Sequence, residues 1–497
     1  MKKYFPLSFI ALLMLIMACS DSNDIIEEVE VIDNEPEVIE PNEYAGINNF
    51  IYGSMNYWYR WKDNVRDLAD DRFPNNQEYN AYLRASGTPE NFLETLVYNR
   101  QTVDVFTRLI PDWIEDAGNL AGNQGTNGVE FGLTLYGDDK ILGYVQFILP
   151  GSDADGKDIA RGDLFTEVNG VEMNRRNYQS LLFSENPTYT LNLSKLVGNT
   201  ITPTGRTVEL TKTDYEENPV LSVKVFEEAG KRIGYIHYIQ FTAKESELNA
   251  AFLELKNQGI SDLILDLRYN GGGYAEVSQA LACMITGQFK GEVLTRQKYN
   301  DDIMGAYDED TFQRRFIDRT TGSFSDEVIN SLNLNSVHII TAWGTASASE
   351  TLISGLSAYI SVKTVGETTY GKYTGGATLY DSPTGGREDV NPDHTYALYP
   401  IFYTNTNSLG ASWPQGISPN IAIDEDLGNM GIVGDRNEPL LQAAINDIVG
   451  IAAKTDYVKT FDYENIGNSR MNRILPTDLI ESRPEFMEAI KKMKQKK

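Results

Sequence analysis

The chain has 497 residues, of which 41% are hydrophobic and 11% aromatic, and its formal net charge at pH 7 is −28. This length suggests about three domains, and the composition is ample for packed hydrophobic cores, so we expect a globular protein. Such an acidic chain is poorly suited to bind DNA or RNA, because the phosphate backbone would repel it.

The first 18 residues are typical of a secretory signal. Met1-Lys-Lys precedes an apolar run from Phe5 to Ala18, which is too short to span a bilayer. The segment Ile16-Met-Ala-Cys19 resembles a bacterial lipobox, which implies that Cys19 is lipidated and that acyl chains anchor the mature protein to a membrane. We therefore predict a lipoprotein signal peptide at 1–18 and a lipid-anchored protein of the bacterial cell envelope, with outer-membrane, periplasmic and surface-exposed positions all open. An ordinary signal peptide with a chance cysteine is the alternative.

Residues 19–44 are predicted to form an acidic tether. Ser20 to Glu43 contains ten carboxylates, two prolines and no lysine or arginine, a composition that favours an extended, self-repelling chain. The only other cysteine, Cys283, lies in the apolar stretch ALACMI and is expected in a core. Lipidation of Cys19 would therefore leave no intrachain disulfide.

Two regions precede the part of the chain with candidate catalytic residues. Residues 45–120 carry aromatic-rich helical patterns and predict an N-terminal helical module. Residues 125–220 alternate as strands with tight turns and resemble a small β-rich PDZ domain. That resemblance implies that Phe131, Gly132 and Leu133 form the loop that receives the terminal carboxylate of a peptide, while the peptide adds as a strand. A PDZ shape used only for packing is the alternative.

A predicted catalytic domain spans residues 225–450. Leu263 to Leu267 is an apolar run typical of a buried parallel strand, and the turn Arg268-Tyr-Asn-Gly-Gly-Gly-Tyr274 follows it. Consecutive glycines let backbone N–H groups approach a substrate where side chains would block them. The polar stretch between Gly287 and Asn335 is predicted to form a flap, and residues 451–497 a solvated C-terminal extension.

Ser347 lies at the junction of a predicted strand, Val337 to Thr341, and a predicted helix that begins near Ala346. A hydroxyl at a helix start has unpaired N–H groups beside it, notably that of Ala348, and the helix dipole favours a developing oxyanion there. Ser347 is therefore a candidate nucleophile. Ser347-Ala-Ser-Glu350 is also an S-x-x-E capping box, which would give this serine a purely structural role.

Lys372 follows a second apolar strand, Ile360 to Val365, which is expected to lie beside the first and to bring both residues to one end of a sheet. A lysine acts as a general base only when neutral, so its pKa would have to fall by roughly three units from about 10.4, which requires burial. The segment Gly366 to Lys372 also fits most of a phosphate-binding loop, but Tyr373 stands where a serine or threonine must hold magnesium.

Other hydrolytic chemistry finds little support. The chain has three histidines, His237, His338 and His394, and only His394 is expected in a loop where it could act as a base. No G-x-S-x-G elbow and no H-E-x-x-H zinc motif occurs in the sequence. A serine and lysine pair remains, with no metal and no cofactor expected.

Three motifs, LILDLRYNGGG, GTASASE and the lysine of GKY, stand in an order and spacing that resemble the C-terminal processing (tail-specific) peptidase family of serine proteases. The resemblance implies an α/β catalytic core of the ClpP/crotonase type, a mixed sheet with helices, beside the PDZ-like domain and the helical module. It further implies that Ser347 attacks the peptide, that Lys372 is the base, and that the N–H groups of Ala348 and of Gly273 or Gly272 form the oxyanion hole.

The chain departs from this pattern at two positions. Ala358 stands where many relatives carry an acidic residue, and Gly376 where many carry a glutamine. The group that orients the lysine therefore stays open, with Tyr370, Thr374 and Glu367 as candidates. The sequence predicts a serine endopeptidase that acts on proteins or peptides, recognises a C-terminal segment and works through an acyl-enzyme. The alternative is a catalytically inactive, lipid-anchored peptide-binding protein of the same fold. The sequence predicts no oligomeric state.

Overall fold

The computed structural model describes residues 43–114, 125–184, 186–320, 325–451, 461 and 463–470, together with the backbone of 479–480. The predicted signal peptide, Cys19 and nearly all of the predicted tether lie outside the described residues. Within the described ranges, no helix is both long and apolar enough to cross a membrane.

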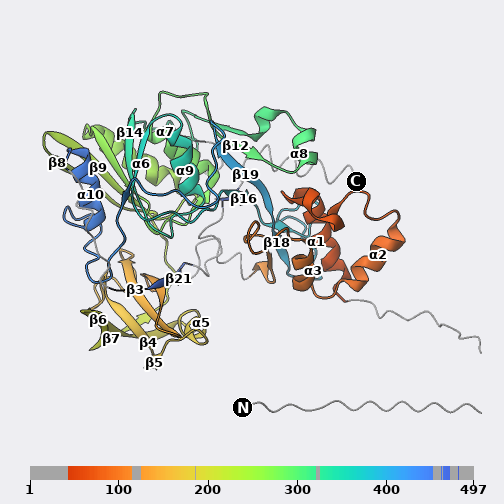
Figure 1. The fold of residues 1–497 in the computed structure, drawn as a ribbon, viewed down its shortest axis with the longest axis horizontal. Coiled ribbons are helices and arrows are strands. Elements are labelled where there is room, and N and C mark those ends of the chain that lie inside the picture. Colours follow the sequence, from red (N-terminus) through yellow and green to blue (C-terminus); the bar gives the residue numbers. More distant parts are fainter. Residues whose placement is uncertain are drawn as a thin grey trace, which may run out of the picture. The chain divides into compact units, whose positions relative to one another are not determined.

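The N-terminal region is helical, as the sequence predicts (Figure 1). It contains α1 (Ala45–Trp58), α2 (Asn76–Ala85) and α3 (Pro89–Leu96). Two of these helices begin at side-chain caps, since the side chains of Asn75 and Thr88 accept hydrogen bonds from the first turns of α2 and α3. The buried face of α1 packs into a core that continues into the catalytic region, where the Trp58 ring lies 4.8 Å from that of Phe402.

Residues 125–213 form a small β domain with a hydrophobic core of its own. Its strands are β2 (Val129–Tyr136), β3 (Lys140–Ile148), β4 (Leu164–Val168), β5 (Val171–Glu172), β6 (Thr188–Val197) and β7 (Thr200–Thr211), with the short helix α5 (Tyr178–Leu182). The sheet order is β21-β2-β3-β4-β6-β7, with β5 paired to β4. The outermost strand, β21 (Glu464–Asn468), comes from the far end of the sequence and is visible in blue against the orange strands in Figure 1.

The central sheet of the catalytic region has the order β20-β15-β14-β10-β9-β8. Its strands are β8 (Val220–Glu228), β9 (Lys231–Tyr238), β10 (Asp262–Asp266), β14 (Ser336–Thr341), β15 (Ser361–Gly366) and β20 (Ile421–Ala422). All neighbouring pairs from β9 to β20 are parallel, and β8 is antiparallel to β9. The predicted strand at Leu263 to Leu267 and the two predicted strands that flank Ser347 are therefore confirmed.

Helices cover both faces of this sheet, which explains why its central strands are apolar on both sides. Leu263 and Leu265 share a core with α6 (Glu245–Asn257), α7 (Ala275–Ile285) and α9 (Ala348–Ser357). The alternate residue Ile264 packs with α10 (Pro439–Ile448) on the opposite face. Cys283 on α7 is buried, as predicted, and burial raises the pKa of its thiol to about 12.

A third sheet has the order β11-β22-β16-β19-β12-β13. Its strands are β11 (Gly273–Tyr274), β22 (Leu479–Ile480), β16 (Thr374–Gly376), β19 (Ile401–Asn407), β12 (Val293–Lys298) and β13 (Gln313–Arg315). A smaller sheet joins β1 (Arg108–Ile110) to β18 (Ala397–Tyr399) and β17 (Leu379–Tyr380), so that the N-terminal region pairs with the catalytic region.

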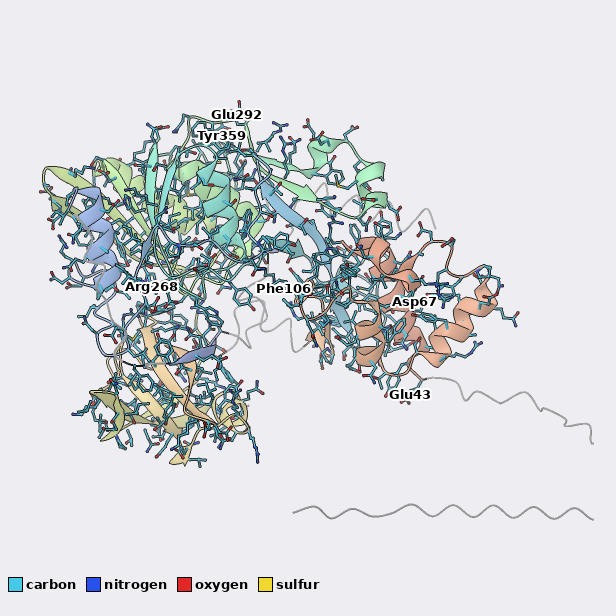
Figure 2. All side chains as sticks on the ribbon, in the orientation of Figure 1. Glu43, Asp67, Phe106, Arg268, Glu292 and Tyr359 are labelled. Carbon is cyan, nitrogen blue, oxygen red and sulfur yellow. The ribbon has the colours of Figure 1, made fainter. Side chains whose placement is uncertain are left out.

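Two predictions about irregular segments are wrong. The expected flap after Gly287 instead supplies β12 and β13 to the third sheet, with α8 (Asp301–Ala306) following β12. Its base is fixed by Tyr359, whose hydroxyl donates to the Val293 carbonyl at 2.6 Å, and Figure 2 shows Tyr359 beside Glu292. The expected solvated extension after residue 451 contains two paired strands, β21 and β22, whose partners are too remote in sequence for a local pattern to reveal.

Candidate active site

Ser347 follows β14 and caps the N-terminus of α9. Its backbone has φ 61° and ψ −109°, a conformation that costs a non-glycine residue roughly 1–3 kcal/mol. The side chain is fully buried, and its Oγ has no hydrogen-bond partner among the described residues. A buried, unpaired hydroxyl on a strained turn is typical of a functional position rather than of a stabilising one.

Glu350 holds this turn from one helical turn further on. Its Oε2 accepts the Ser347 N–H at 2.8 Å, which is the glutamate half of the capping box recognised in the sequence. The serine half, in which the Ser347 hydroxyl faces the Glu350 N–H, is also present but makes no regular hydrogen bond, so the hydroxyl stays available for other chemistry.

The glycine turn after β10 lies directly against Ser347. A Cβ placed on Gly272 would lie 2.7 Å from Ser347 Cβ and 3.0 Å from the backbone nitrogen of Ala348. Asn270 fixes the turn: its Oδ1 accepts the Gly272 N–H at 3.0 Å, and its carbonyl accepts the Ser349 hydroxyl at 3.0 Å. The sequence-predicted residues Ser347, Ala348 and Gly272 are therefore brought together.

The Gly273 N–H is directed away from the segment at Phe241. The residues on either side of Gly273 bond to that segment: Phe241 N–H donates to the Gly272 carbonyl, and Tyr274 N–H donates to the Phe241 carbonyl, each at 2.9 Å. Alternate residues of a strand direct their backbone groups to opposite edges, so the Gly273 N–H is directed to the edge occupied by β22. Only glycine fits here, since φ is 134° and a Cβ would lie 2.1 Å from the Phe241 oxygen.

Lys372 is fully buried in a pocket with aromatic walls. Its Nζ lies 4.6 Å from the ring centroid of Phe106, which is labelled in Figure 2, and 5.6 Å from that of Tyr399. The Lys372 N–H donates at 2.8 Å to the same Glu350 oxygen that accepts the Ser347 N–H. The two backbone nitrogens are therefore separated by no more than twice that distance.

Glu350 joins the serine turn to the lysine loop and was recognised from sequence only as a possible cap. Its Oε2 accepts from Ser347 and Lys372, while its Oε1 accepts the Gly371 N–H at 2.6 Å and the Thr369 hydroxyl at 2.5 Å. Burial raises the pKa of this carboxyl to about 7, and the hydrogen bonds that it accepts act in the opposite direction.

A turn at Pro414 to Gly416 supports the lysine loop from outside. Cβ atoms placed on Gly371 and Gly416 would lie 2.8 Å and 2.1 Å from backbone atoms of the opposite segment, so the two segments meet backbone to backbone. The Thr369 hydroxyl also accepts the Ile417 N–H at 2.7 Å, which extends the Glu350 network into this turn.

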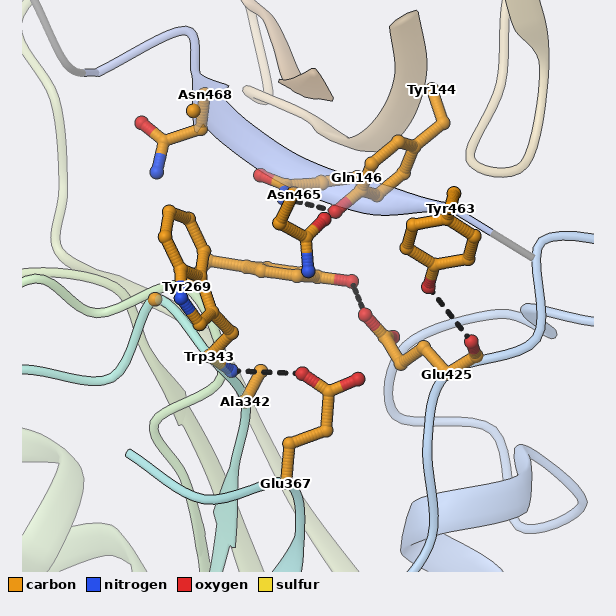
Figure 3. Close-up of a pocket in the computed structure, with 12 residues that line it drawn as sticks. Tyr144, Gln146, Tyr269, Ala342, Trp343, Glu367, Glu425, Tyr463, Asn465 and Asn468 are labelled. Carbon is orange, nitrogen blue, oxygen red and sulfur yellow. Dashed lines mark hydrogen bonds between the residues drawn. The ribbon is translucent and has the colours of Figure 1, made fainter. Parts of the chain in front are cut away.

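The three residues proposed to orient the lysine differ in their surroundings. Glu367 Oε2 accepts the Trp343 N–H at 2.9 Å, as the dashed line in Figure 3 shows. The Tyr370 ring lies between those of Trp343 and Phe106 and is 41% exposed. Thr374 is buried, and its hydroxyl has no hydrogen-bond partner within the described part of the chain.

The two departures from the family pattern have structural settings of their own. A Cβ on Gly376 would lie 2.2 Å from the Pro400 oxygen, so this backbone has no room for a glutamine. Ala358 is the C-cap of α9, about 16 Å from Ser347 along the helix axis. An acidic side chain at position 358 would therefore lie at the opposite end of the helix from the serine.

Arg268 anchors the start of the glycine turn in a fully buried ion network. Its guanidinium contacts Asp266 at 2.9 Å, Glu438 at 2.7 Å and Glu425 at 3.3 Å. Arg161 of the small β domain donates to Glu425 as well and to the Tyr269 hydroxyl. Asp266 and Arg268 thus hold the start of the turn.

None of the histidines, all of which the structure describes, contacts the Ser347 hydroxyl. His237 is buried in β9, where burial lowers its pKa to about 4. His338 binds Asp447 at 2.7 Å and His394 binds Asp381 at 3.1 Å. In the described ranges, no group of three or more acidic, histidine or cysteine side chains could hold a metal ion.

The prediction of a carboxylate-binding loop at Phe131 to Leu133 is wrong, because these residues form part of a strand. Phe131, Gly132 and Leu133 lie inside β2, paired to β3 on one edge and to β21 on the other. Gly132 is required because the Tyr144 ring crosses it, and a Cβ would lie 2.1 Å from that ring. These residues belong to a different sheet from β14, the strand that precedes Ser347, and Cys19 lies outside the described residues.

Two family models match the chain. The model for peptidase family S41 matches residues 232–423, which include the glycine turn, Ser347 and Lys372, and the model for the peptidase S41 N-terminal domain matches residues 46–108. The chain belongs to peptidase family S41. S41 is a family of serine peptidases and therefore of hydrolases.

This S41 chain is similar to a curated relative and to a solved structure. It is 25% identical over 300 residues to a carboxyl-terminal-processing protease of Picosynechococcus sp. (strain ATCC 27264 / PCC 7002 / PR-6), an alignment that covers 60% of this chain and 64% of the relative. A solved structure from Bacteroides fragilis NCTC 9343, described as an S41 protease, superposes with a TM-score of 0.60 at 23% identity, covering 81% of this chain and 97% of that one. The second similarity shows a shared S41 fold.

Proposed function

We propose that this S41 chain is a serine endopeptidase that hydrolyses peptide bonds of proteins or peptides, with Ser347 as nucleophile and Lys372 as general base. The observation that carries the proposal is the Ser347 hydroxyl, buried and unpaired at a strained helix start that Glu350 ties to the Lys372 backbone. No histidine contacts that hydroxyl, which favours the buried lysine as the base.

In the proposed reaction, Ser347 Oγ adds to the carbonyl carbon of the scissile peptide while its proton passes to the neutral amine of Lys372. As the C–N bond breaks, the Lys372 ammonium returns this proton to the leaving amine, and an ester remains on Ser347. Water then attacks the ester while the lysine accepts a proton of that water. As the ester C–O bond breaks, the Lys372 ammonium returns this proton to Ser347 Oγ, and the acyl part of the substrate leaves as a carboxylic acid.

The negative oxygen of each tetrahedral intermediate would be held by backbone N–H groups. Ala348 offers its N–H at the start of α9, where the helix dipole favours negative charge. We assign the second donor to Gly273 rather than to Gly272, because the Gly272 N–H already donates to Asn270.

We also propose that the substrate is recognised through an extended segment near its C-terminus. The name of the Picosynechococcus relative, a carboxyl-terminal-processing protease, supports this preference. Peptides that carry the same scissile sequence, followed by tails of different length and terminal chemistry, test it. The preference requires that amidation of the terminal carboxylate lowers kcat/KM.

The catalytic proposal is tested with a fluorophosphonate probe and an unstructured peptide. We expect labelling at Ser347, its loss in Ser347→Ala, and a fall in kcat on the order of 10²- to 10⁴-fold in Lys372→Ala. Ser357→Ala, at the other end of α9, and Lys363→Ala, on the exposed side of β15, are matched controls that retain activity. A folded chain that binds peptides yet is neither labelled nor active would instead be the inactive peptide-binding protein.

We further infer a lipid-anchored location in the bacterial envelope from residues 1–44 alone. In cells fed with a labelled fatty acid, the wild-type chain should carry the label and remain with membranes. Cys19→Ser should lose both properties, and a labelled Cys19→Ser chain would refute the assignment.

A further inference from the structure

The edge of β2 in the small β domain is occupied by the chain itself. Strand β21 pairs antiparallel with β2, with Gly132 opposite Asn468 and Leu135 opposite Glu464. At the end of β21, the Ser469 N–H donates to the Phe131 carbonyl at 2.8 Å, and the Phe131 N–H donates to the Ser469 hydroxyl at 3.1 Å. Strand addition at this edge, which the sequence predicts for a substrate, is thus made by residues 464–469.

Buried polar contacts fix this segment in place. Arg470 is 5% exposed and binds Glu130 at 3.2 Å, Glu217 at 2.7 Å and Gln240 at 2.8 Å. The Tyr463 hydroxyl donates to the Glu425 carbonyl at 3.1 Å, and Figure 3 shows both residues in the wall of a pocket that Trp343 and Glu367 also line.

A second strand of the same segment lies in the catalytic region. β22 runs parallel to β11, with Gly273 opposite Leu479, and parallel to β16, with Gly376 opposite Ile480. In the sheet order β22 stands between β11 and β16. Because paired strands are about 4.8 Å apart, the space between β11 and β16 is roughly 9.6 Å wide and admits one extended strand.

This space, which we call the β11–β16 slot, lies beside Gly273, the proposed oxyanion donor, and close in sequence to Lys372, the proposed base. The Gly273 N–H is directed into the slot, and β16 begins two residues after Lys372. Three of the five residues of β11 and β16 are glycines: side chains are excluded at Gly273 by the Phe241 carbonyl, at Gly375 by the Tyr403 ring and at Gly376 by the Pro400 carbonyl. Such walls leave peptide groups as the contact surface for an incoming chain.

We propose that the β11–β16 slot is the binding site for the backbone of an extended substrate segment, and that β22 is its built-in occupant, held in reach by β21. This inference rests on the proposed function. A substrate enters as a strand parallel to β11 and β16, and it has to displace β22 first. The chain is therefore latent while β22 occupies the slot. Peptide segments that cannot extend or that carry proline at the paired positions are excluded as substrates.

The experiment compares four forms of the chain that leave the Ser347 and Lys372 region intact. They are the full chain, Ile480→Pro, Ile480→Val and a chain that ends after Arg470, which keeps β21 and loses β22. Proline removes the N–H and breaks the pairing of a strand, whereas valine preserves both the N–H and the β propensity. For each form, the rate of fluorophosphonate labelling and kcat/KM for an unstructured peptide are measured.

We expect Ile480→Pro and the shortened chain to react at least about ten times faster than the full chain, and Ile480→Val to match the full chain. Equal rates in all four forms would overturn the proposal. Proline could also act by disturbing the fold, and the shortened chain, which carries no substitution, controls for this effect. The proposal requires that both variants are activated and that both retain the wild-type Tm to within a few degrees.

A second measurement separates this proposal from the proposed function. In a Ser347→Ala background, amide hydrogen exchange is followed in peptides that cover residues 270–276 and 374–380, with and without residues 471–497. Removal of β22 should accelerate exchange in both peptides, whether or not the protein has any peptidase activity. Unchanged exchange overturns the occupancy of the slot. Accelerated exchange without hydrolysis or labelling in any form supports the occupancy and counts against the endopeptidase.

Discussion

Glu350 joins Ser347, the proposed nucleophile, to the lysine loop by accepting four hydrogen bonds, three of them from backbone N–H groups, which can only donate. Only the Thr369 hydroxyl can turn to accept a proton from this carboxyl. A protonated, neutral Glu350 is a weaker acceptor than the carboxylate for the N–H groups of Ser347 and Lys372, so protonation loosens the positions of both residues.

We predict that kcat for peptide hydrolysis rises as the pH passes through about 7, the value to which burial raises the Glu350 pKa. The sign for stability is opposite. A carboxyl whose pKa is raised on folding stabilises the fold below its ordinary value of 4.5, and this contribution is lost as the pH rises through about 7. Glu350→Gln should remove this ionisation from the kcat profile and lower kcat about 10²-fold with little change in KM. A profile that keeps the step at pH 7 in Glu350→Gln would contradict the assignment.

Gly272 is a second position in the site at which a single added carbon atom should abolish activity. Its φ is 109°, and a Cβ added to it would lie 2.7 Å from Ser347 Cβ, so Gly272→Ala should displace the nucleophile and strain the turn. We expect loss of hydrolysis and of probe labelling, together with a lower Tm. Gly46→Ala in α1, where a Cβ has open space, should leave activity unchanged. An active Gly272→Ala enzyme would show that the turn can yield to a methyl group.

At the scale of elements, β10 ends in the buried network around Arg268. Arg268→Met would leave Asp266, Glu425 and Glu438 without this partner, and removal of one side of a buried ion network costs about 3–5 kcal/mol. Denaturant unfolding measures this change. The exposed pair Arg319 and Asp326 provides the control, because Arg319→Met should cost about 0–1 kcal/mol. An equal loss of unfolding free energy in the two variants would show that the buried network contributes no more to stability than an exposed ion pair.

Local patterns were sufficient for the elements that carry Ser347 and Lys372. The apolar runs at Val337 and Ile360 predicted β14 and β15, and the S-x-x-E segment predicted the start of α9. They failed for β22, because a two-residue strand takes its structure from Gly273 and Gly376 rather than from its own sequence. They also failed for Phe131 to Leu133, since the pattern cannot show which strand covers an edge.

At the scale of the whole molecule, Arg470 joins three segments through Glu130 on β2, Glu217 before β8 and Gln240 after β9. We predict that a chain ending at Gly450 has a lower Tm than one ending at Arg470. It also exposes the edge of β2, which favours association between chains. Calorimetry and light scattering over a range of concentrations measure both effects. A monomeric Gly450 chain with unchanged Tm would show that β21 contributes little.

The contact between Phe106 and the Lys372 amine connects the N-terminal helical region to the catalytic region. Lys372, the proposed base, lies in one family domain, residues 232–423, and the ring that shields it lies in the other, residues 46–108. A fragment cut before β8 would expose that amine to bulk water, where it would hold its proton too firmly to act. If Lys372 is the base, the N-terminal region helps to keep its amine dry, and the smallest active fragment has to include that region.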